Sequence, residues 1–246
     1  MDRMLYVAMS GARETLKAQA ANNHNLANAS TTGFHADMAA FQARQVTGSG
    51  FASRVYATTS TTGIDQSSGT MQTTGRDLDV AIQGNGFLTV QGADGREAYT
   101  RAGNLRVDPS GQLLTATGQI VMGDGGPISV PPNTSLLLGG DGTLSVIPQG
   151  SGPETKAVVG RLKMVDPPAD QLARGSDGLF RLKDGTDAPS SATVRLESGV
   201  LESSNVNVAD AMVHMIELAR RFDLQVKSMK SAEDNGAASA QLLRLG

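Results

Sequence analysis

The feature that most constrains this chain is a long stripe of apolar side chains near its C-terminal end. The stripe advances in steps of four and three residues through Val208, Met212, Met215, Ala219, Phe222, Val226 and Met229. A sustained period of about 3.5 residues is typical of a helix that packs lengthwise against another helix. Asn207 lies three residues before Asp210, a spacing that predicts an N-cap at Asn207 and a helix over 208–244. At about 1.5 Å per residue, this helix is too long to bury itself against a domain of this size.

The N-terminal segment carries a similar stripe. Apolar and polar residues share one register through Leu5, Met9, Ala12, Leu16, Gln19, Asn23 and Leu26. This stretch contains no proline and predicts a second helix. We therefore expect an α+β protein whose N- and C-terminal helices form a coiled-coil-like helical domain.

The middle of the chain has the pattern of β-structure. Short runs rich in Val, Ile, Leu and Thr, such as 78–82, 87–90, 143–147 and 158–165, alternate with turn residues. Asp-Gly pairs and the stretch Asp108-Pro109-Ser110-Gly111 are typical of hairpin tips and type I turns. The predicted organisation is an N-terminal helix over 1–34, an extended arm over 35–68, a β-rich irregular barrel or sandwich over 69–200, and a C-terminal helix over 201–246.

Composition argues against several classes of function. The formal net charge is −3, so the chain lacks the basic surface of a nucleic-acid-binding protein. It has no cysteine, and its three histidines are scattered without metal-ligand spacing. Neither a membrane span nor a Sec signal peptide is expected. We predict no cofactor, no small-molecule substrate and no enzymatic activity, although a hydrolase with paired carboxylates on the β domain stays open, as does a cytosolic coiled-coil adaptor.

Three motifs in fixed order carry a resemblance to a known family. They are Asn25-Leu26-Ala27-Asn28-Ala29-Ser30-Thr31-Thr32-Gly33-Phe34, then Tyr99-Thr100-Arg101-Ala102-Gly103-Asn104, then Glu202-Ser203-Ser204-Asn205-Val206-Asn207. Together they resemble the signatures of the rod and hook axial proteins of the bacterial flagellum. One departure is His24, which stands where that family often has an asparagine.

The resemblance implies a structural subunit of the basal-body rod that polymerises through its terminal helices. It also implies partners among copies of itself and other rod proteins, export by the flagellar type III apparatus without a cleaved signal peptide, and a rod that spans the periplasm. The opening residues are most similar to proximal rod subunits, with distal rod subunits as the alternative.

On this interpretation, two groups of residues are functional candidates. The candidates for the assembly interface are Leu5, Met9, Leu16, Asn25, Leu26, Asn28, Gly33, Phe34, Asn205, Val208, Met212, Met215, Phe222, Val226 and Met229. The candidates for the β-domain signature are Thr100, Arg101, Gly103 and Asn104. Burial of the apolar members against neighbours would offset the cost of ordering two helices that are marginal on their own.

Overall fold

The computed structural model describes residues 3–45, 55–149 and 155–242. The chain divides into two compact units. Unit 1 is built from Met1–Ala27, Asp37–Thr62 and Asn207–Gly246, and unit 2 from Asn28–Ala36 and Gly63–Val206. Each unit is therefore assembled from segments that are distant in the sequence.

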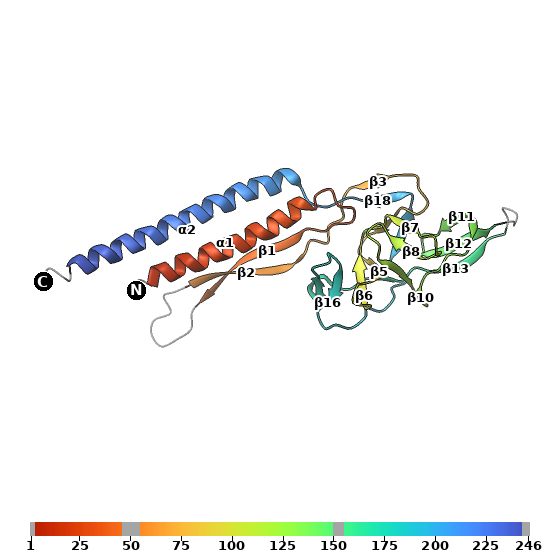
Figure 1. Ribbon diagram of the computed structural model, residues 1–246, viewed down its shortest axis with the longest axis horizontal. Coiled ribbons are helices and arrows are strands. Elements are labelled where there is room, and N and C mark those ends of the chain that lie inside the picture. Colours follow the sequence, from red (N-terminus) through yellow and green to blue (C-terminus); the bar gives the residue numbers. More distant parts are fainter. Residues whose placement is uncertain (1–2, 46–54, 150–154, 243–246) are drawn as a thin grey trace. The chain divides into compact units, whose positions relative to one another are not determined.

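Unit 1 contains two helices and a pair of strands. Helix α1 (Arg3–Ala27) and helix α2 (Val208–Leu242) run antiparallel and side by side, and β1 (Asp37–Gln45) pairs with β2 (Val55–Ile64) (Figure 1). The predicted cap of α2 is confirmed, because Oδ1 of Asn207 accepts hydrogen bonds from the N–H groups of Ala209 at 3.0 Å and Asp210 at 3.4 Å. These bonds satisfy amide groups that have no partner within the helix.

The prediction of a coiled-coil-like domain formed by the two terminal helices is wrong. Among the described residues, the structure has one α-helix near each end and a large β-rich middle. The unit that holds α1 and α2 also holds β1 and β2, and β1 contacts α1. Unit 1 is therefore a mixed α/β unit, while the β-rich middle itself is as expected.

The residues that the two helices bury are mostly small. Helix α1 buries Ala8, Ala12 and Ala18, and α2 buries Ala211, Leu218 and Ala232. A Cβ atom on Gly11 would lie only 3.0 Å from the side chain of Gln225, so the helices approach closely there. Because the distance between two packed helices depends on the side chains at their contact, small residues allow this approach. Larger side chains nearby in the sequence, such as Met9, Leu16 and Met212, remain exposed.

Unit 2 consists of short antiparallel strands. They are β3 (Met71–Thr73), β4 (Val80–Gln83), β5 (Phe87–Gln91), β6 (Glu97–Thr100), β7 (Leu105–Val107), β8 (Leu113–Thr115), β9 (Ile120–Gly123), β10 (Gly126–Pro127), β11 (Asn133–Leu138), β12 (Thr143–Pro148), β13 (Ala157–Arg161), β14 (Met164–Val165), β15 (Leu172–Arg174), β16 (Phe180–Leu182), β17 (Arg195–Ser198) and β18 (Val200–Glu202), with a 3-10 helix η1 (Ala169–Gln171). The largest sheet has the order β15-β16-β6-β5-β9-β8-β7, with β10 paired to β9 and β14 to β5. Smaller sheets are β11-β12-β13, β17-β4 and β18-β3.

Two hydrophobic clusters form the core of unit 2. The larger one is built from aliphatic side chains of the main sheet, the β11-β12-β13 sheet and β4 and β17. The smaller one gathers Phe87, Tyr99, Val165, Leu172 and Phe180. In β12, Leu144 and Val146 are buried and the residues on either side of them are not, which is the alternation expected of a strand with one face on a core.

The predicted turns lie between the strands as the sequence indicates. Asp108–Gly111 connects β7 to β8, and Gly111 has φ 86°, a value that glycine adopts without steric cost. The predicted arm over 35–68 contains all of β1 and β2. The four-part division of the chain stays a prediction.

Candidate functional site

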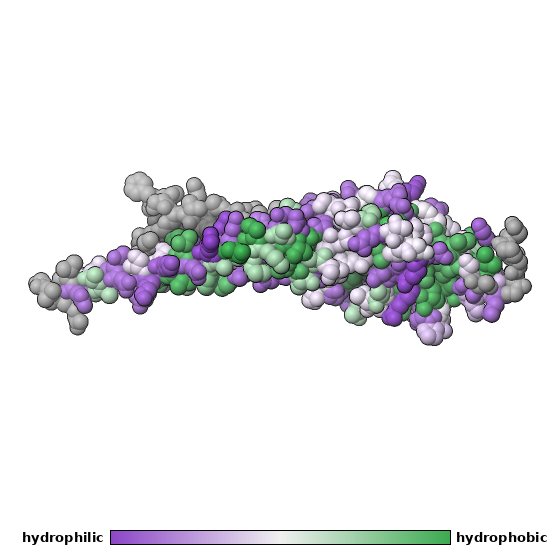
Figure 2. Space-filling view, turned by 90° about the horizontal axis from the view of Figure 1, so that it is seen from above, coloured by the Kyte–Doolittle hydropathy of each residue, from purple (hydrophilic) through white to green (hydrophobic). Residues whose placement is uncertain are grey.

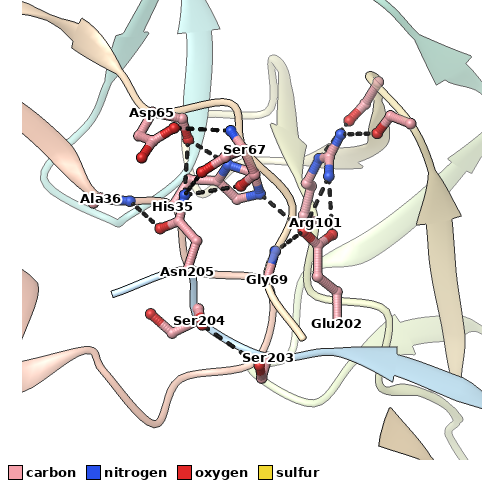
Figure 3. Close-up of polar contacts among 12 residues, drawn as sticks. His35, Ala36, Asp65, Ser67, Gly69, Arg101, Glu202, Ser203, Ser204 and Asn205 are labelled. Atoms are coloured by element: carbon pink, nitrogen blue, oxygen red, sulfur yellow. Dashed lines mark hydrogen bonds and ion pairs between the residues drawn. The ribbon is translucent and has the colours of Figure 1, made fainter. Parts of the chain in front are cut away.

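Parts of the three sequence motifs meet in unit 2, where Gly33 contacts both Arg101 and Glu202. Figure 3 shows the buried ion pair of Arg101 and Glu202 at this place. Arg101 follows β6, Glu202 ends β18, and His35 follows the first motif. All three side chains are almost inaccessible to solvent, with at most 2% of each residue exposed. We call these three residues the buried charge cluster.

The guanidinium of Arg101 donates hydrogen bonds from all three of its nitrogen atoms. Its Nη1 lies 3.1 Å from Oε1 and 3.0 Å from Oε2 of Glu202. Its Nε donates to the carbonyl of Gly86 at 2.9 Å, and its Nη2 donates to the carbonyl of Gly84. A buried guanidinium with this many acceptors is well compensated for its loss of water.

Glu202 is held in the charged form by its surroundings. Its Oε1 accepts a hydrogen bond from the N–H of Gly69 at 2.9 Å and lies 3.3 Å from Nε2 of His35. The other ring nitrogen of His35 lies 2.7 Å from the carbonyl oxygen of Asp65. Burial alone would raise the pKa of Glu202, but the hydrogen bond from His35, the charge of Arg101 and the N–H of Gly69 together lower this pKa below its ordinary value of 4.5.

Two glycines bring the backbone close enough to form the cluster. Gly33 has φ 67°, and a Cβ atom there would lie 2.3 Å from the carbonyl of Arg101. A Cβ atom on Gly69 would lie 1.9 Å from the carbonyl oxygen of Ser203. No L side chain fits at either position, so the motif residue Gly33 is a requirement of the packing.

The rest of the β-domain signature shapes the segment after β6. Oγ1 of Thr100 accepts from the N–H of Ala102 at 3.1 Å, and the carbonyl of Gly103 accepts from the N–H of Val80 at 2.9 Å. The carbonyl of Asn104 accepts from the N–H of Ala116 at 2.9 Å. These bonds fix the backbone on both sides of Arg101.

A second arginine, Arg174, contacts Phe34 at the end of the first motif. The guanidinium carbon of Arg174 lies 4.5 Å from the ring centre of Phe34 and 4.4 Å from that of Phe180, and its Nη2 donates to the carbonyl of His35. A cation over two aromatic rings is attracted by both. Phe34 is thus held on β15 and β16 of unit 2.

The first three residues of the first motif, Asn25 to Ala27, lie in unit 1. Nδ2 of Asn25 donates to the carbonyl of Asp37 at 2.9 Å, and Oδ1 of Asn25 accepts from the N–H of Asp37 at 2.9 Å. His24 lies 2.9 Å from a carboxylate oxygen of the same Asp37. His24, the residue just before the first motif, therefore binds at the start of β1. Leu26 is half-buried, and Asn28, already in unit 2, accepts from the N–H of Thr31 at 3.0 Å.

The predicted interface residues of the helices fall into two groups. The exposed ones are Met9, Leu16, Val208, Met212 and Val226, and the half-buried ones are Leu5, Met215, Phe222 and Met229. Large apolar residues that the sequence analysis left out are also exposed on the helices: Tyr6, Val213, Ile216 and Leu224. Figure 2 shows hydrophobic residues gathered on the surface of the helical part of the chain.

His35, Glu202 and Arg174 do not stand out as individual residues in the sequence. His35 is one of three scattered histidines, although it sits one residue beyond the first motif. A charged residue in an otherwise apolar strand, as in Val200-Leu201-Glu202, is a signal that could have identified the acid.

The described part of the chain offers little that resembles a reaction centre. Within it, no group of three or more His, Asp or Glu residues is placed to hold a metal ion. A depression of about 360 Å³ between α1 and α2 is lined by polar residues that include Asn22, His214 and Glu217. Over the same described residues, neither helix has the length and apolar composition that crossing a membrane requires.

The comparisons with known proteins agree with the three motifs. The model of the flagellar hook protein FlgE/F/G D1 domain matches residues 81–146, and the model of the flagellar basal body rod FlgEFG protein C-terminal region matches residues 197–242. The flagellar basal-body rod protein FlgF of Salmonella typhimurium is 45% identical, and that of Escherichia coli 46%, with 100% of both chains covered in each case. The chain belongs to the flagellar basal-body rod proteins.

Within this family the rod protein is more similar to these FlgF relatives than to FlgG. The FlgG protein of Bacillus subtilis is 30% identical, over 95% of this chain and 96% of the relative. The chain is thus a structural subunit of the flagellar basal body, and none of the matched families is catalytic. Arg101 lies within the first matched region and Glu202 within the second, so the buried ion pair joins the two family regions.

Proposed function

We propose that this rod protein belongs to the proximal part of the rod and polymerises through apolar side chains of α1 and α2. The observation that carries the proposal is the concentration of exposed large apolar residues on these two helices. Most of the exposed large hydrophobic side chains of the described residues lie there, among them Met212, Val213 and Ile216, each more than half exposed. A contiguous exposed apolar surface of this kind is typical of a protein–protein interface.

The energetics favour assembly. Burying one Met, Val or Ile side chain contributes about 1.5–3 kcal/mol. The exposed residues of α2 alone would therefore outweigh much of the cost of bringing subunits together, which is several kcal/mol. An interface between different faces of identical or related subunits extends as a helix instead of closing as a dimer. The partners are copies of this chain and other rod proteins.

The motif residues that contact other parts of the chain support assembly indirectly. Asn25, Asn28, Gly33, Phe34 and Asn205 make contacts within the chain. We infer that they contribute to polymerisation by fixing the ends of the segments that carry the helices. We infer that four half-buried residues would also contact the neighbouring subunit, at the edge of the exposed apolar surface. They are Leu5, Met215, Phe222 and Met229.

The proposal extends to export and chemistry. We infer that the flagellar type III apparatus exports the chain without cleaving a signal peptide, and that the rod it joins spans the periplasm. We also infer that the chain is no enzyme and takes no cofactor, nucleic acid or small-molecule substrate. Family membership and the acidic net charge support these inferences. A distal position is the second candidate, because the FlgG relatives align over most of the chain.

The test uses the deletion strain of the source bacterium, complemented with variants. The full chain should restore swimming, and a chain lacking residues 208–246 should not, with basal bodies halted near the inner membrane in electron micrographs. A variant with Met212→Glu and Ile216→Glu should also fail to assemble, because two carboxylates would enter the apolar contact.

The matched control is Val158→Glu, which places a charge on an exposed apolar position of unit 2. It should swim normally. Purified helix variants must keep the circular dichroism spectrum of the parent, so that loss of assembly reports on the surface. Normal swimming of the Met212→Glu, Ile216→Glu variant would refute the proposed interface, and complete rods in the deletion strain would refute the rod function.

A further inference from the structure

Methionine is concentrated on the two helices of unit 1. Half of the ten methionines in the chain lie on α1 and α2: Met4, Met9, Met212, Met215 and Met229. The chain has no cysteine, so its sulfur chemistry belongs to methionine alone. A methionine thioether reacts with peroxides to give the sulfoxide, and the rate of this reaction depends on how exposed the sulfur is.

Met212 lies within a row of exposed apolar side chains on α2. Val208, Met212 and Ile216 are four residues apart, so they share one face of the helix. They are 43%, 52% and 58% exposed, and Val213 beside them is 55% exposed. Met212 is therefore at the centre of the surface proposed for assembly, with its side chain open to solvent in the single subunit.

Met9 has similar surroundings on α1. Tyr6 precedes it by three residues and Leu16 follows it by seven, which places all three on one side of the helix. About half of each of these residues is exposed. Each helix therefore carries one exposed methionine among exposed apolar neighbours.

We propose that Met9 and Met212 are sites of oxidation by peroxides, and that their sulfoxides prevent the subunit from joining the rod. This role depends on the assembly surface proposed above. In the reaction a lone pair on sulfur attacks one oxygen of hydrogen peroxide and the O–O bond breaks. The proton of the attacked oxygen passes to the departing hydroxide, which leaves as water. The sulfur is oxidised by two electrons, the peroxide is reduced, and one oxygen atom is transferred.

The product does not suit an apolar contact. A sulfoxide is polar and accepts hydrogen bonds, and burying a polar group without a partner costs free energy. Each sulfoxide should weaken binding of the neighbouring subunit by about tenfold or more. Assembly would cover the same side chains, so the reaction acts on subunits that have not yet joined the rod. Sulfoxide reductases reverse the change, which makes it a switch.

The first measurement identifies the oxidised residues in the purified full-length chain. The chain is treated with hydrogen peroxide, and peptide mass spectrometry gives the sulfoxide fraction of each methionine with time. Met9 and Met212 should react at least about tenfold faster than Met164, which is 1% exposed. Rates no higher than that of Met164 would overturn the proposal.

The second measurement asks whether these two sites decide assembly. The deletion strain is complemented with the natural chain, with Met9→Leu, Met212→Leu, or with the matched control Met38→Leu, Met71→Leu. Met38 on β1 and Met71 on β3 are 50% and 40% exposed and lie outside the helices. Leucine has a volume similar to that of methionine and contains no sulfur.

For each strain, completed basal bodies are counted with and without a sublethal dose of hydrogen peroxide, and the two counts are compared as a ratio. The ratio should stay near one for Met9→Leu, Met212→Leu and should fall for both the natural chain and the control. A ratio for Met9→Leu, Met212→Leu as low as that of the natural chain would overturn the proposal. So would protection by Met38→Leu, Met71→Leu.

Glutamine variants test the same point without an oxidant, because glutamine is polar and close to the sulfoxide in length. Met9→Gln, Met212→Gln should fail to restore swimming, whereas Met38→Gln, Met71→Gln should restore it. Normal swimming of Met9→Gln, Met212→Gln would contradict the inference. If the assembly surface itself is wrong, the Met212→Glu, Ile216→Glu variant swims normally as well. If only the oxidation inference is wrong, that variant still fails to assemble.

Discussion

Replacing Arg101 with methionine tests whether the buried ion pair stabilises unit 2. The substitution keeps an apolar stem of similar length and removes the guanidinium. Glu202, 1% exposed, would lose both contacts with Nη1, and the carbonyls of Gly84 and Gly86 would lose their donors. Removing one partner of a buried pair costs about 3–5 kcal/mol, because the remaining charge is left uncompensated.

The expected result is a loss of about 4 kcal/mol in the free energy of unfolding of unit 2. For a unit of roughly 150 residues this corresponds to a thermal midpoint lower by about 8–16 °C. Urea unfolding followed by circular dichroism measures the loss, since the chain has no tryptophan to serve as a fluorescent probe. The slope of the unfolding curve should be unchanged.

Two further variants make this prediction decisive. Arg106→Met replaces an exposed arginine on neighbouring β7 and should change stability by no more than about 0.5 kcal/mol. A variant with both Arg101→Met and Glu202→Gln should be more stable than Arg101→Met alone, because no buried charge is left unpaired. A loss below about 1 kcal/mol in Arg101→Met, or no recovery of stability in the double variant, would refute this reasoning. Either result would show that Arg101 does not offset the cost of burying the Glu202 carboxylate.

Three other perturbations have defined outcomes. Because the folded-state pKa of Glu202 lies below 4.5, its ionised form contributes stability above about pH 4.5 that is lost as the pH falls through the folded pKa. The stability difference between the natural chain and Glu202→Gln, measured by urea unfolding, should therefore shrink on acidification, and a constant difference would contradict the assignment. Gly33→Ala should cost roughly 2–4 kcal/mol because of its positive φ and the contact with Arg101, whereas Gly125→Ala, which meets open space, should be neutral in the same assay. Asn207→Ala should destabilise α2 by about 1 kcal/mol, seen as faster amide exchange in its first turn; unchanged exchange would mean that the cap contributes nothing.

Local features of the chain were predictable from the sequence. The cap at Asn207 and the turn at 108–111 were identified because their chemistry depends on neighbours within a few residues. The apolar stripes correctly indicated two helices. The larger side chains dominate the pattern, so it does not indicate that Ala8, Ala211 and Ala232 are among the residues buried on the helices.

The buried charge cluster could not have been assembled from the sequence. Arg101 and Glu202 are 101 residues apart, and no periodic pattern relates them. The motifs that contain them resemble those of a known family. Such a resemblance identifies the segments that are important, but it does not indicate that Arg101 and Glu202 form an ion pair. The close backbone approach at Gly69 is equally invisible, since a glycine in a polar segment is more often a simple turn.

The division of unit 1 into separate segments has a consequence for the order of folding. Many strand pairs of unit 2 join near neighbours in the sequence, so their loops close at low entropic cost, whereas β17-β4 and β18-β3 pair over more than 100 residues and close only when the chain has reached Glu202. Helix α1, in contrast, has to wait for α2, which follows some 180 residues later. A chain that emerges from its N-terminal end would therefore complete unit 2 first and carry α1 as an unpaired segment until the last residues arrive. The apolar surface of the helices would then form last.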